Sequence, residues 1–408
     1  MNLPRMAPVA VVAQSLASAT GVGLGTLLQA LRDGRHKLVH NSGPNTCSHT
    51  PLDTWVGAVP GLMSWPWPTA WAAWDCRATR LAWLGLQADD FVGAAQLACR
   101  HHGAARVGLV LGTSASTIGA SEYAYRRPAD DGGFPAPLRH EALNTLHALA
   151  DFVQQALGLQ GPCVTVSTAC SSSAKAFAQA ERWLRLGLAD AVVVGGVDAL
   201  CDSLLFGFHA LQLVSPKPCQ PFGAERRGIS VGEAAGFCLL QRGPGALCLV
   251  GHGESNDAHH MSSPHPKGLG AELALDAALA RAGLAAGGAI NDIGYLNLHG
   301  TASARNDAVE AALVARRYPA AVHASATKGV TGHTMGAAGI VEALVCLLAL
   351  GQDLCAGSVG STPLDPALGP VFARQLQAHT AVRQVKFAAS HSFGFGGNNA
   401  VLLFGRGL

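Results

Sequence analysis

Three runs rich in valine, leucine and glycine limit what this chain can fold into. They read RVGLVLGTS at 106–114, AVVVGGVDA at 191–199 and LCLVGHGES at 247–255. Continuous apolar runs of this length are typical of strands that are buried on both faces. Helix-like segments follow several of them. Strands that alternate with helices in this way predict an α/β protein with helices layered against its sheets.

The N-terminal segment is expected to form the first of these strands. Residues 7–19, APVAVVAQSLASA, superficially resemble a secretory signal peptide because a small-residue tail follows a short apolar run. Arg5 is the only basic residue before that run, so we favour a buried strand at 9–14 and a helix at 24–34. The longest apolar run elsewhere, 343–350, is too short to span a membrane. We therefore expect a cytoplasmic protein without a membrane span.

Composition excludes several classes of function. Hydrophobic residues make up 49% of the chain and charged residues 13%, which suits a large core and argues against disorder. The net charge of +2, without a dense Lys/Arg run, argues against a nucleic-acid-binding protein. The 11 cysteines are scattered without a C-x-x-C pair, and the 17 histidines show no recognised ligand spacing. We therefore expect reduced thiols and no metal.

The chain carries a weak internal similarity. Residues 167–187, STACSSSAKAFAQAERWLRLG, form a polar turn with a cysteine, followed by a helix with an apolar stripe. Residues 327–351, TKGVTGHTMGAAGIVEALVCLLALG, repeat that layout with His333 near the start. No low-complexity linker divides the chain. We therefore predict a duplicated α/β fold with an N-terminal half at 1–245 and a C-terminal half at 246–408.

Six of the seven tryptophans lie between residues 55 and 83. A hydrophobic cluster under a long loop would account for them. A surface for a partner subunit is the alternative, because aromatic residues are enriched in the cores of interfaces. We favour the hydrophobic cluster.

Cys170 is the first candidate for catalysis. A single cysteine in an apolar context is usually structural, but this one precedes a credible helix that begins within SSSAKAFAQ. The N–H groups and dipole of a helix N-terminus favour a thiolate over a thiol. The small neighbours Ala169, Ser171 and Ser172 would let a substrate carbonyl approach. A nucleophilic cysteine also needs acid–base partners and an oxyanion hole from elsewhere in the chain.

Two later stretches contain suitable partners. In YLNLHGTASARND, at 295–307, an apolar run ends at His299. In SATKGVTGHTMGAAG, at 325–339, Lys328 and His333 flank a glycine-containing turn. Either histidine alone would more often be a hydrogen-bonded core or surface residue. Both are expected to end strand-like runs and to begin glycine-rich loops, which favours a functional role.

Four motifs together make a specific resemblance. They are VSTACSSSAKA, HGTAS, SATKGVTGHTMGAAGIVEA and HSFGFGGNNA, and in this order they cover the chain from about residue 105 to its end. The sequence resembles an elongating β-ketoacyl-acyl carrier protein synthase, one of the thiolase-fold condensing enzymes. It looks closest to the synthases of aryl-polyene-type pigment clusters. The resemblance implies a five-layered αβαβα thiolase-like fold with two duplicated halves.

The resemblance also implies an active site. The catalytic positions fall on Cys170, His299 and His333. Starter-type synthases use Cys-His-Asn, and His333 argues against that class. Lys328 takes the place of the active-site lysine, and we expect it to pair with Glu342.

Further motif residues match positions that contact substrate in relatives. Phe395, with Phe393 beside it, corresponds to the phenylalanine that gates the acyl pocket. The backbone N–H groups of Phe395 and Cys170 would form the oxyanion hole. Thr301 and Ser303 match hydroxyls that contact the phosphopantetheine arm. The carrier protein supplies that arm, so no cofactor of the enzyme itself is expected.

The implied reaction is ping-pong. Cys170 takes an acyl group from a carrier-protein thioester, and malonyl-carrier protein then enters. His299 and His333 hold its carbonyl while decarboxylation makes an enolate that attacks the acyl group. The chain departs from the common motifs at Ser303 and Asn398, where threonine is usual, and at SARND. These departures put the substrate range in doubt.

Two other functions are possible for a chain with this resemblance. A non-catalytic chain-length factor, the partner subunit of some synthases, would lack the nucleophile that Cys170 supplies here. A thiolase would need a second catalytic cysteine near the C-terminus, and FGFGGNNA contains none.

The resemblance also implies protein partners. The family forms homodimers or heterodimers, the latter with a chain-length-factor-like homologue. Acyl carrier proteins are acidic, so we expect a basic docking site. Arg126, Arg127 and Lys217, on predicted loops, are candidates, although ordinary solvated charges would explain them equally well.

Overall fold

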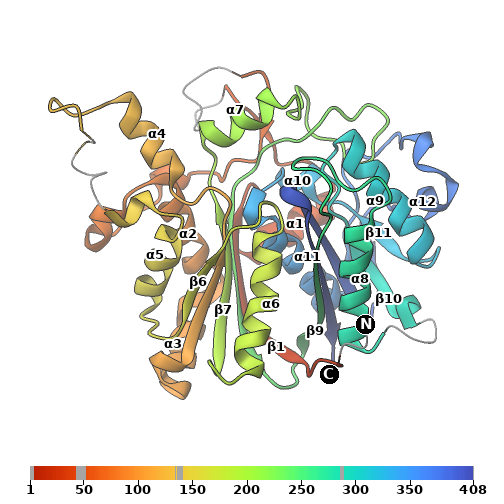
Figure 1. Cartoon of the computed structure of the whole chain (residues 1–408), viewed down its shortest axis with the longest axis horizontal. Coiled ribbons are helices and arrows are strands. Elements are labelled where there is room, and N and C mark those ends of the chain that lie inside the picture. The colour runs from red at the N-terminus through yellow and green to blue at the C-terminus, as the bar shows by residue number, and fades with distance from the viewer. Residues whose placement is uncertain (1–3, 43–51, 134, 136–140, 285–288, 408) are drawn as a thin grey trace.

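The computed structural model describes residues 4–42, 52–133, 135, 141–284 and 289–407. Two β-sheets stand side by side, with one layer of helices between them and one on each outer face (Figure 1). The five-layered αβαβα prediction is confirmed. The first outer layer contains α2 (Arg77–Gln87), α3 (Phe91–His102) and α5 (Ala148–Leu157). The middle layer contains α6 (Ser172–Arg185) and α11 (Ala338–Gln352), and the second outer layer contains α8 (Leu269–Ala282) and α9 (Ala304–Arg317).

The first sheet has six strands in the order β2-β1-β8-β7-β5-β6. β5 pairs in parallel with β6 and β7, whereas β8 is antiparallel to β7 and β1. Every residue of β5 and β7 is buried, as the continuous apolar runs predicted. The strands are β1 (Val9–Ser18), β2 (Gly21–Val22), β5 (Val107–Gly112), β6 (Cys163–Val166), β7 (Ala191–Asp198) and β8 (Ala234–Arg242).

The second sheet has five strands in the order β11-β10-β14-β15-β9. β10 pairs in parallel with β11 and β14, whereas β15 is antiparallel to β14 and β9. The strands are β9 (Leu247–Asn256), β10 (Ile293–Asn297), β11 (His323–Ser325), β14 (Phe387–Gly394) and β15 (Asn398–Arg406). The remaining helices and strands are α1 (Leu24–Asp33), α4 (Ile118–Arg126), α7 (Asp202–Ala210), α10 (Lys328–Thr331), α12 (Pro370–Gln375), β3 (Val39–His40), β4 (Trp55–Val56), β12 (Leu354–Cys355) and β13 (Ala381–Val382).

The two middle helices approach each other closely because glycines face them. A Cβ on Gly339 of α11 would lie 2.4 Å from the backbone nitrogen of Ala174 in α6. A Cβ on Gly112, at the end of β5, would lie 2.3 Å from the nitrogen of Ser173. Real Cβ atoms do not come so near to backbone atoms. Glycine at these positions therefore lets β5, α6 and α11 meet at the start of α6.

α11 is unusually apolar. Together with the turn before it, Met335–Gln352 is long and apolar enough to cross a membrane by length and composition, and 89% of that stretch is buried inside the protein. It packs against α6 and both sheets. A helix that is apolar on all sides suits such a core position.

The tryptophan-rich segment divides between core and surface. The rings of Trp67, Trp71 and Trp74 surround Phe152 of α5, with centroids 5.8, 5.4 and 5.7 Å from its ring. This is the hydrophobic cluster that the sequence analysis favoured. Trp65, in contrast, keeps 44% of its surface exposed.

Candidate active site

Cys170 lies in the turn between β6 and α6. Ala169 before it has a φ of 51°, a backbone conformation that residues other than glycine rarely adopt. The Ser172 hydroxyl holds the turn, because it accepts a hydrogen bond from the Thr168 N–H at 2.9 Å and donates one to the Ala169 carbonyl at 2.6 Å. Only 6% of Cys170 is exposed, although its sulfur lines a cavity.

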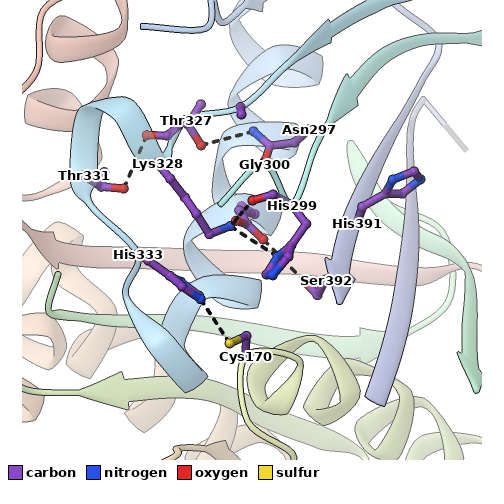
Figure 2. Close-up of polar contacts among 12 residues, drawn as sticks. Cys170, Asn297, His299, Gly300, Thr327, Lys328, Thr331, His333, His391 and Ser392 are labelled. Carbon is purple, nitrogen blue, oxygen red and sulfur yellow. Dashed lines mark hydrogen bonds and ion pairs between the residues drawn. The ribbon is translucent and has the colours of Figure 1, made fainter. Parts of the chain in front are cut away.

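His333 is the nearest polar partner of Cys170. Its Nε2 lies 3.0 Å from the Cys170 Sγ (Figure 2). The prediction that His333 ends a strand was wrong, because α10 intervenes between β11 and the histidine. The His333 N–H donates to the Ser230 carbonyl at 2.7 Å, which fixes the backbone. Its Nδ1 has no hydrogen-bond partner among the residues that the structure describes, so none of them selects a tautomer.

His299 follows β10, as predicted, and Lys328 holds it. The Lys328 Nζ lies 3.3 Å from the His299 Nδ1 and 2.6 Å from its carbonyl oxygen (Figure 2). It also contacts the Glu342 carboxylate. The predicted Lys328–Glu342 pair therefore forms. Three contacts match the three hydrogens of an ammonium group. A proton donated to Nδ1 leaves the proton of neutral His299 on Nε2, which points toward Cys170 and His333.

Glu310 of α9 supports the same loop and was not predicted. Its carboxylate accepts the backbone N–H groups of His299 and Gly300, each at 2.8 Å, and contacts the His391 Nδ1 at 3.1 Å. Glu310 and Asp307 are both buried and stand one turn apart on α9. The sequence signal that could have identified Glu310 is that two acidic residues lie on the apolar side of one helix.

Burial sets the protonation of the three catalytic candidates. It lowers the pKa of His299 and of His333 well below the ordinary histidine value, and Lys328 adds to this, so both imidazoles are neutral. Burial raises the pKa of the Cys170 thiol to about 12, although Lys328 acts in the opposite direction. The expectation of a resting thiolate was therefore wrong. Desolvation by burial is the largest influence on this pKa.

The three side chains were also considered as metal ligands. The Cys170 sulfur and one nitrogen from each of His299 and His333 lie within 4.8 Å of one another, close enough for one cation to contact all three. A ligating Nε2 on His299 would have to carry no proton. Donation from Lys328 to Nδ1 disfavours that tautomer. The arrangement favours N–H donation over metal binding.

The loop after β14 closes over Cys170. The backbone N–H of Phe395 reaches the Cys170 sulfur and lowers its pKa. A Cβ on Gly394 would stand 3.1 Å from the Cys170 nitrogen, so a glycine allows this approach. Phe393 lies beside His299, with ring centroids 6.0 Å apart. Phe395 contacts Phe208 of α7 at 5.6 Å, a partner that was not predicted.

A cavity of about 510 Å³ extends outward from these residues. Cys170, His299 and His333 lie at its buried end, and Thr301 and Ser303 line its wall. The Thr301 and Ser303 hydroxyls are 2.9 Å apart. The cavity therefore brings all of these residues together, and Phe393 and Phe395 with them.

The three predicted docking residues lie away from the cavity lining. Arg126 ends α4 and is not on a loop, and its guanidinium pairs with Asp202 at 2.5 Å. Lys217 pairs with Glu225 at 3.6 Å. Arg127 follows α4 and is exposed. The loop placement was correct for Arg127 and Lys217 and wrong for Arg126, and both Arg126 and Lys217 have acidic partners.

Comparisons with known proteins agree with this geometry. The β-ketoacyl synthase N-terminal domain matches residues 82–246 and the corresponding C-terminal domain matches residues 247–361. Nodulation protein E of Rhizobium meliloti (strain 1021) is 33% identical over 335 residues, which are 78% of this chain and 80% of that protein. The 3-oxoacyl-[acyl-carrier-protein] synthase 2 of Vibrio cholerae is 31% identical over 343 residues, 79% of this chain and 80% of that protein.

A solved structure is similar over nearly the whole chain. It is that of a ketosynthase (ApeO) in complex with its chain length factor (ApeC) from Xenorhabdus doucetiae. The matched chain has a TM-score of 0.87 and 31% identity, and the match covers 98% of both chains. On the family match, the relatives and this structure, the chain belongs to the β-ketoacyl synthase family.

Proposed function

We propose that this β-ketoacyl-acyl carrier protein synthase condenses malonyl-carrier protein with an acyl group held on Cys170. One observation carries the proposal. The Cys170 sulfur lies 3.0 Å from His333, at the buried end of a cavity that also presents His299. A nucleophile, a proton acceptor and N–H donors thus share one water-restricted space.

In the first half-reaction, the Cys170 sulfur attacks the carbonyl carbon of an acyl-carrier thioester. His333 accepts the thiol proton at Nε2 and returns it to the departing sulfur of the carrier arm. The backbone N–H groups of Cys170 and Phe395 stabilise the oxyanion of the tetrahedral intermediate. The carrier leaves as a free thiol, and the acyl group remains on Cys170.

In the second half-reaction, malonyl-carrier protein enters the same cavity. Its thioester oxygen accepts an N–H bond from His299 while the bond to the carboxylate breaks and CO2 departs. His333 adds a second N–H bond in its Nε2–H tautomer, which is open to it because no described neighbour holds a proton on its Nδ1. The enolate carbon attacks the acyl-Cys170 carbonyl, the bond to sulfur breaks, and the expelled thiolate takes up a proton from solvent. Neutral histidines suit this step because they stabilise negative charge without giving up the proton.

No metal or bound cofactor is needed for these steps. The carrier proteins bring their own phosphopantetheine arms. We assign the arm to the cavity wall that holds Thr301 and Ser303, whose paired hydroxyls can donate to amide oxygens. Thus, the substrates are thioesters of acyl carrier proteins in fatty acid or polyketide chain elongation. The aryl-polyene-type pathway is the narrower proposal, supported by the similarity to a ketosynthase and chain length factor complex.

We further infer that the protein works in the cytoplasm as a dimer. β6 (Cys163–Val166) is the edge strand of the first sheet, and all four of its residues are partly exposed, whereas its neighbour β5 is buried throughout. An unpaired edge strand is a natural place for another chain. A second copy or a chain-length-factor-like homologue would cover it. The functional halves 1–245 and 246–408 would each contribute to the site.

Intact-protein mass spectrometry tests the function. The purified chain is mixed with acyl-carrier protein and then with malonyl-carrier protein, alone and with a candidate partner subunit. We expect one acyl adduct on the wild type, discharged as a β-ketoacyl-carrier product. Cys170→Ala should form no adduct, while Cys99→Ala, which removes a partly exposed thiol outside the site, should behave as the wild type.

The opposite result would support the rival function. If no acyl adduct forms across several chain lengths, even with a partner subunit present, Cys170 is not an acyl-accepting nucleophile. The chain would then be a non-catalytic partner of the chain-length-factor kind.

A further inference from the structure

Two arginines stand at the outer end of the cavity above Cys170. Arg227, between α7 and β8, and Arg305, in the first turn of α9, both line the cavity and are both exposed. Cys170 at the other end is buried, with 6% of its surface exposed. A molecule that reaches the sulfur through this cavity therefore passes the two guanidinium groups.

Both arginines have unused hydrogen-bonding capacity. Arg305 donates to the Ser263 hydroxyl at 2.8 Å, a neutral partner. Among the described residues, Arg227 has no hydrogen-bond or ion-pair partner. The adjacent Arg226 differs, because it pairs with Asp365 at 2.7 Å and lies 3.7 Å from Asp307. Arg226 is thus structural, and the other two charges remain available.

Little negative charge opposes them. Among the described residues that line the cavity, Asp257 is the single carboxylate. One of its oxygens accepts the Asn399 side-chain amide and the other accepts the His265 N–H, each at 2.9 Å. These bonds hold the Asp257 carboxylate within its own loop. The outer end of the cavity therefore carries an excess of positive charge that suits an anion.

We propose that Arg227 and Arg305 bind the phosphate group of the carrier protein's phosphopantetheine arm. This inference rests on the proposed function, which places the thioester end of the arm at Cys170. The other end of the arm carries a phosphodiester, which remains near the surface where the arm joins the carrier. Guanidinium groups bind phosphate oxygens in paired, charge-assisted hydrogen bonds. Arg305 lies in SARND, where the sequence departs from common family motifs.

The test compares thioesters that carry the same acyl group and differ in phosphate. Acyl-pantetheine has none, acyl-phosphopantetheine has one, and acyl-coenzyme A and acyl-carrier protein present the two natural sources. Acylation rates of Cys170 are measured by intact mass for the wild type, R227Q/R305Q and a control, R374Q. Arg374 is an exposed arginine on α12 that does not line the cavity.

We expect the wild type to prefer acyl-phosphopantetheine over acyl-pantetheine by about tenfold, the scale of one or two charge-assisted hydrogen bonds at an exposed site. R227Q/R305Q should lose that preference by slowing with the phosphorylated substrate only. It should also slow with acyl-carrier protein, whereas R374Q should leave all rates unchanged.

Other outcomes would overturn the proposal in distinguishable ways. An unchanged phosphate preference in R227Q/R305Q would exclude these arginines as the phosphate site. Equal slowing with both pantetheine substrates would show that they shape the cavity instead. A loss confined to acyl-coenzyme A would assign them to that thioester rather than to the carrier arm. If no thioester acylates the wild type, the proposed function itself fails.

Discussion

Lys328 contacts His299 twice, through the carbonyl oxygen at 2.6 Å and through the ring nitrogen Nδ1 at 3.3 Å. One ammonium group therefore holds both the backbone and the ring of the same residue. The Glu342 carboxylate accepts the third hydrogen bond of this ammonium group and keeps the lysine in place. Lys328 does not need to touch substrate to matter, because it orients the N–H that His299 presents at Nε2.

The first prediction concerns this orientation. Lys328→Met combined with Glu342→Gln removes the ammonium without leaving a buried carboxylate unpaired. We expect decarboxylation of malonyl-carrier protein to slow by roughly a hundredfold, the scale of one lost oxyanion donor. Release of CO2 measures this step separately from acylation of Cys170. Unchanged decarboxylation would show that His299 keeps its tautomer without the lysine.

The fold could be predicted from the sequence because its signals are local. Runs such as 106–114 and 191–199 are apolar throughout, and only strands covered on both faces tolerate that pattern. The contacts that build the active site, in contrast, join residues that are far apart in the sequence. For example, His333 reaches Cys170 from 163 residues away, and this proximity was inferred from a family resemblance and not from spacing.

The predictions about Cys170 and Arg126 that the structure does not support have the same physical origin. The helix after Cys170 suggested a thiolate, but burial against segments far along the chain decides its pKa. Arg126 was a candidate for docking on a predicted loop, yet it ends α4, and Asp202, 76 residues away, pairs with it. Long-range packing supplies these desolvating and pairing groups, and no local pattern encodes them.

The second prediction is the pH dependence of Cys170 alkylation. Because burial raises the pKa of its thiol to about 12, the reactive thiolate is scarce at neutral pH. Peptide mapping after brief iodoacetamide treatment should show a rate that rises about tenfold per pH unit from pH 7 to 10. Lys328→Met should be slower at each pH, because Lys328 lowers this pKa. A plateau below pH 9 would contradict the assignment of a resting thiol.

The third prediction isolates the close approach of the loop after β14. Gly394 has φ −104° and ψ 162°, which alanine adopts freely, so Gly394→Ala should fold normally. Its Cβ would stand 3.0 Å from the Thr168 carbonyl and 3.1 Å from the Cys170 nitrogen, and would push the Phe395 N–H away from the sulfur. Condensation should slow on the order of a hundredfold.

A matched glycine substitution provides the control. Gly25 lies in α1, and a Cβ there would have no atom within 4 Å. Gly25→Ala should keep full activity and gain slightly in thermal stability, since alanine favours a helix. Equal activity in the Gly394 and Gly25 variants would remove Phe395 from the oxyanion hole.

The fourth prediction concerns the contact between Phe208 and Phe395. An aromatic pair of this kind contributes about 0.5–1.5 kcal/mol, so Phe208→Ala should leave Phe395 more mobile. Water should then reach the acyl-enzyme, and its lifetime, followed by intact mass, should shorten several-fold. Phe206, on the same helix but outside the cavity lining, provides the control substitution Phe206→Ala. Identical lifetimes in the two variants would argue against a role for the Phe208–Phe395 contact in keeping water from the acyl-enzyme.

The fifth prediction follows from Asp307, which is buried on α9 one turn before Glu310. Its carboxylate accepts the Phe222 N–H at 2.7 Å, yet burial raises its pKa from 3.8 to about 7. Between those two values the folded protein holds a proton that the unfolded chain has released. The folded state is therefore favoured at the acidic end of this window, and that stability is lost as the pH rises towards 7.

Asp307→Asn removes this titration while it keeps an oxygen that can accept the Phe222 N–H. We expect the free energy of unfolding of the variant, relative to that of the wild type, to rise between pH 5 and pH 8 by at most about 3 kcal/mol. Asp130, which is exposed, supplies the control Asp130→Asn, measured beside it. Denaturant unfolding at several pH values measures both differences. If the Asp307→Asn difference does not change with pH, Asp307 is ionised across the range, and Arg226, 3.7 Å away, compensates its charge despite the burial.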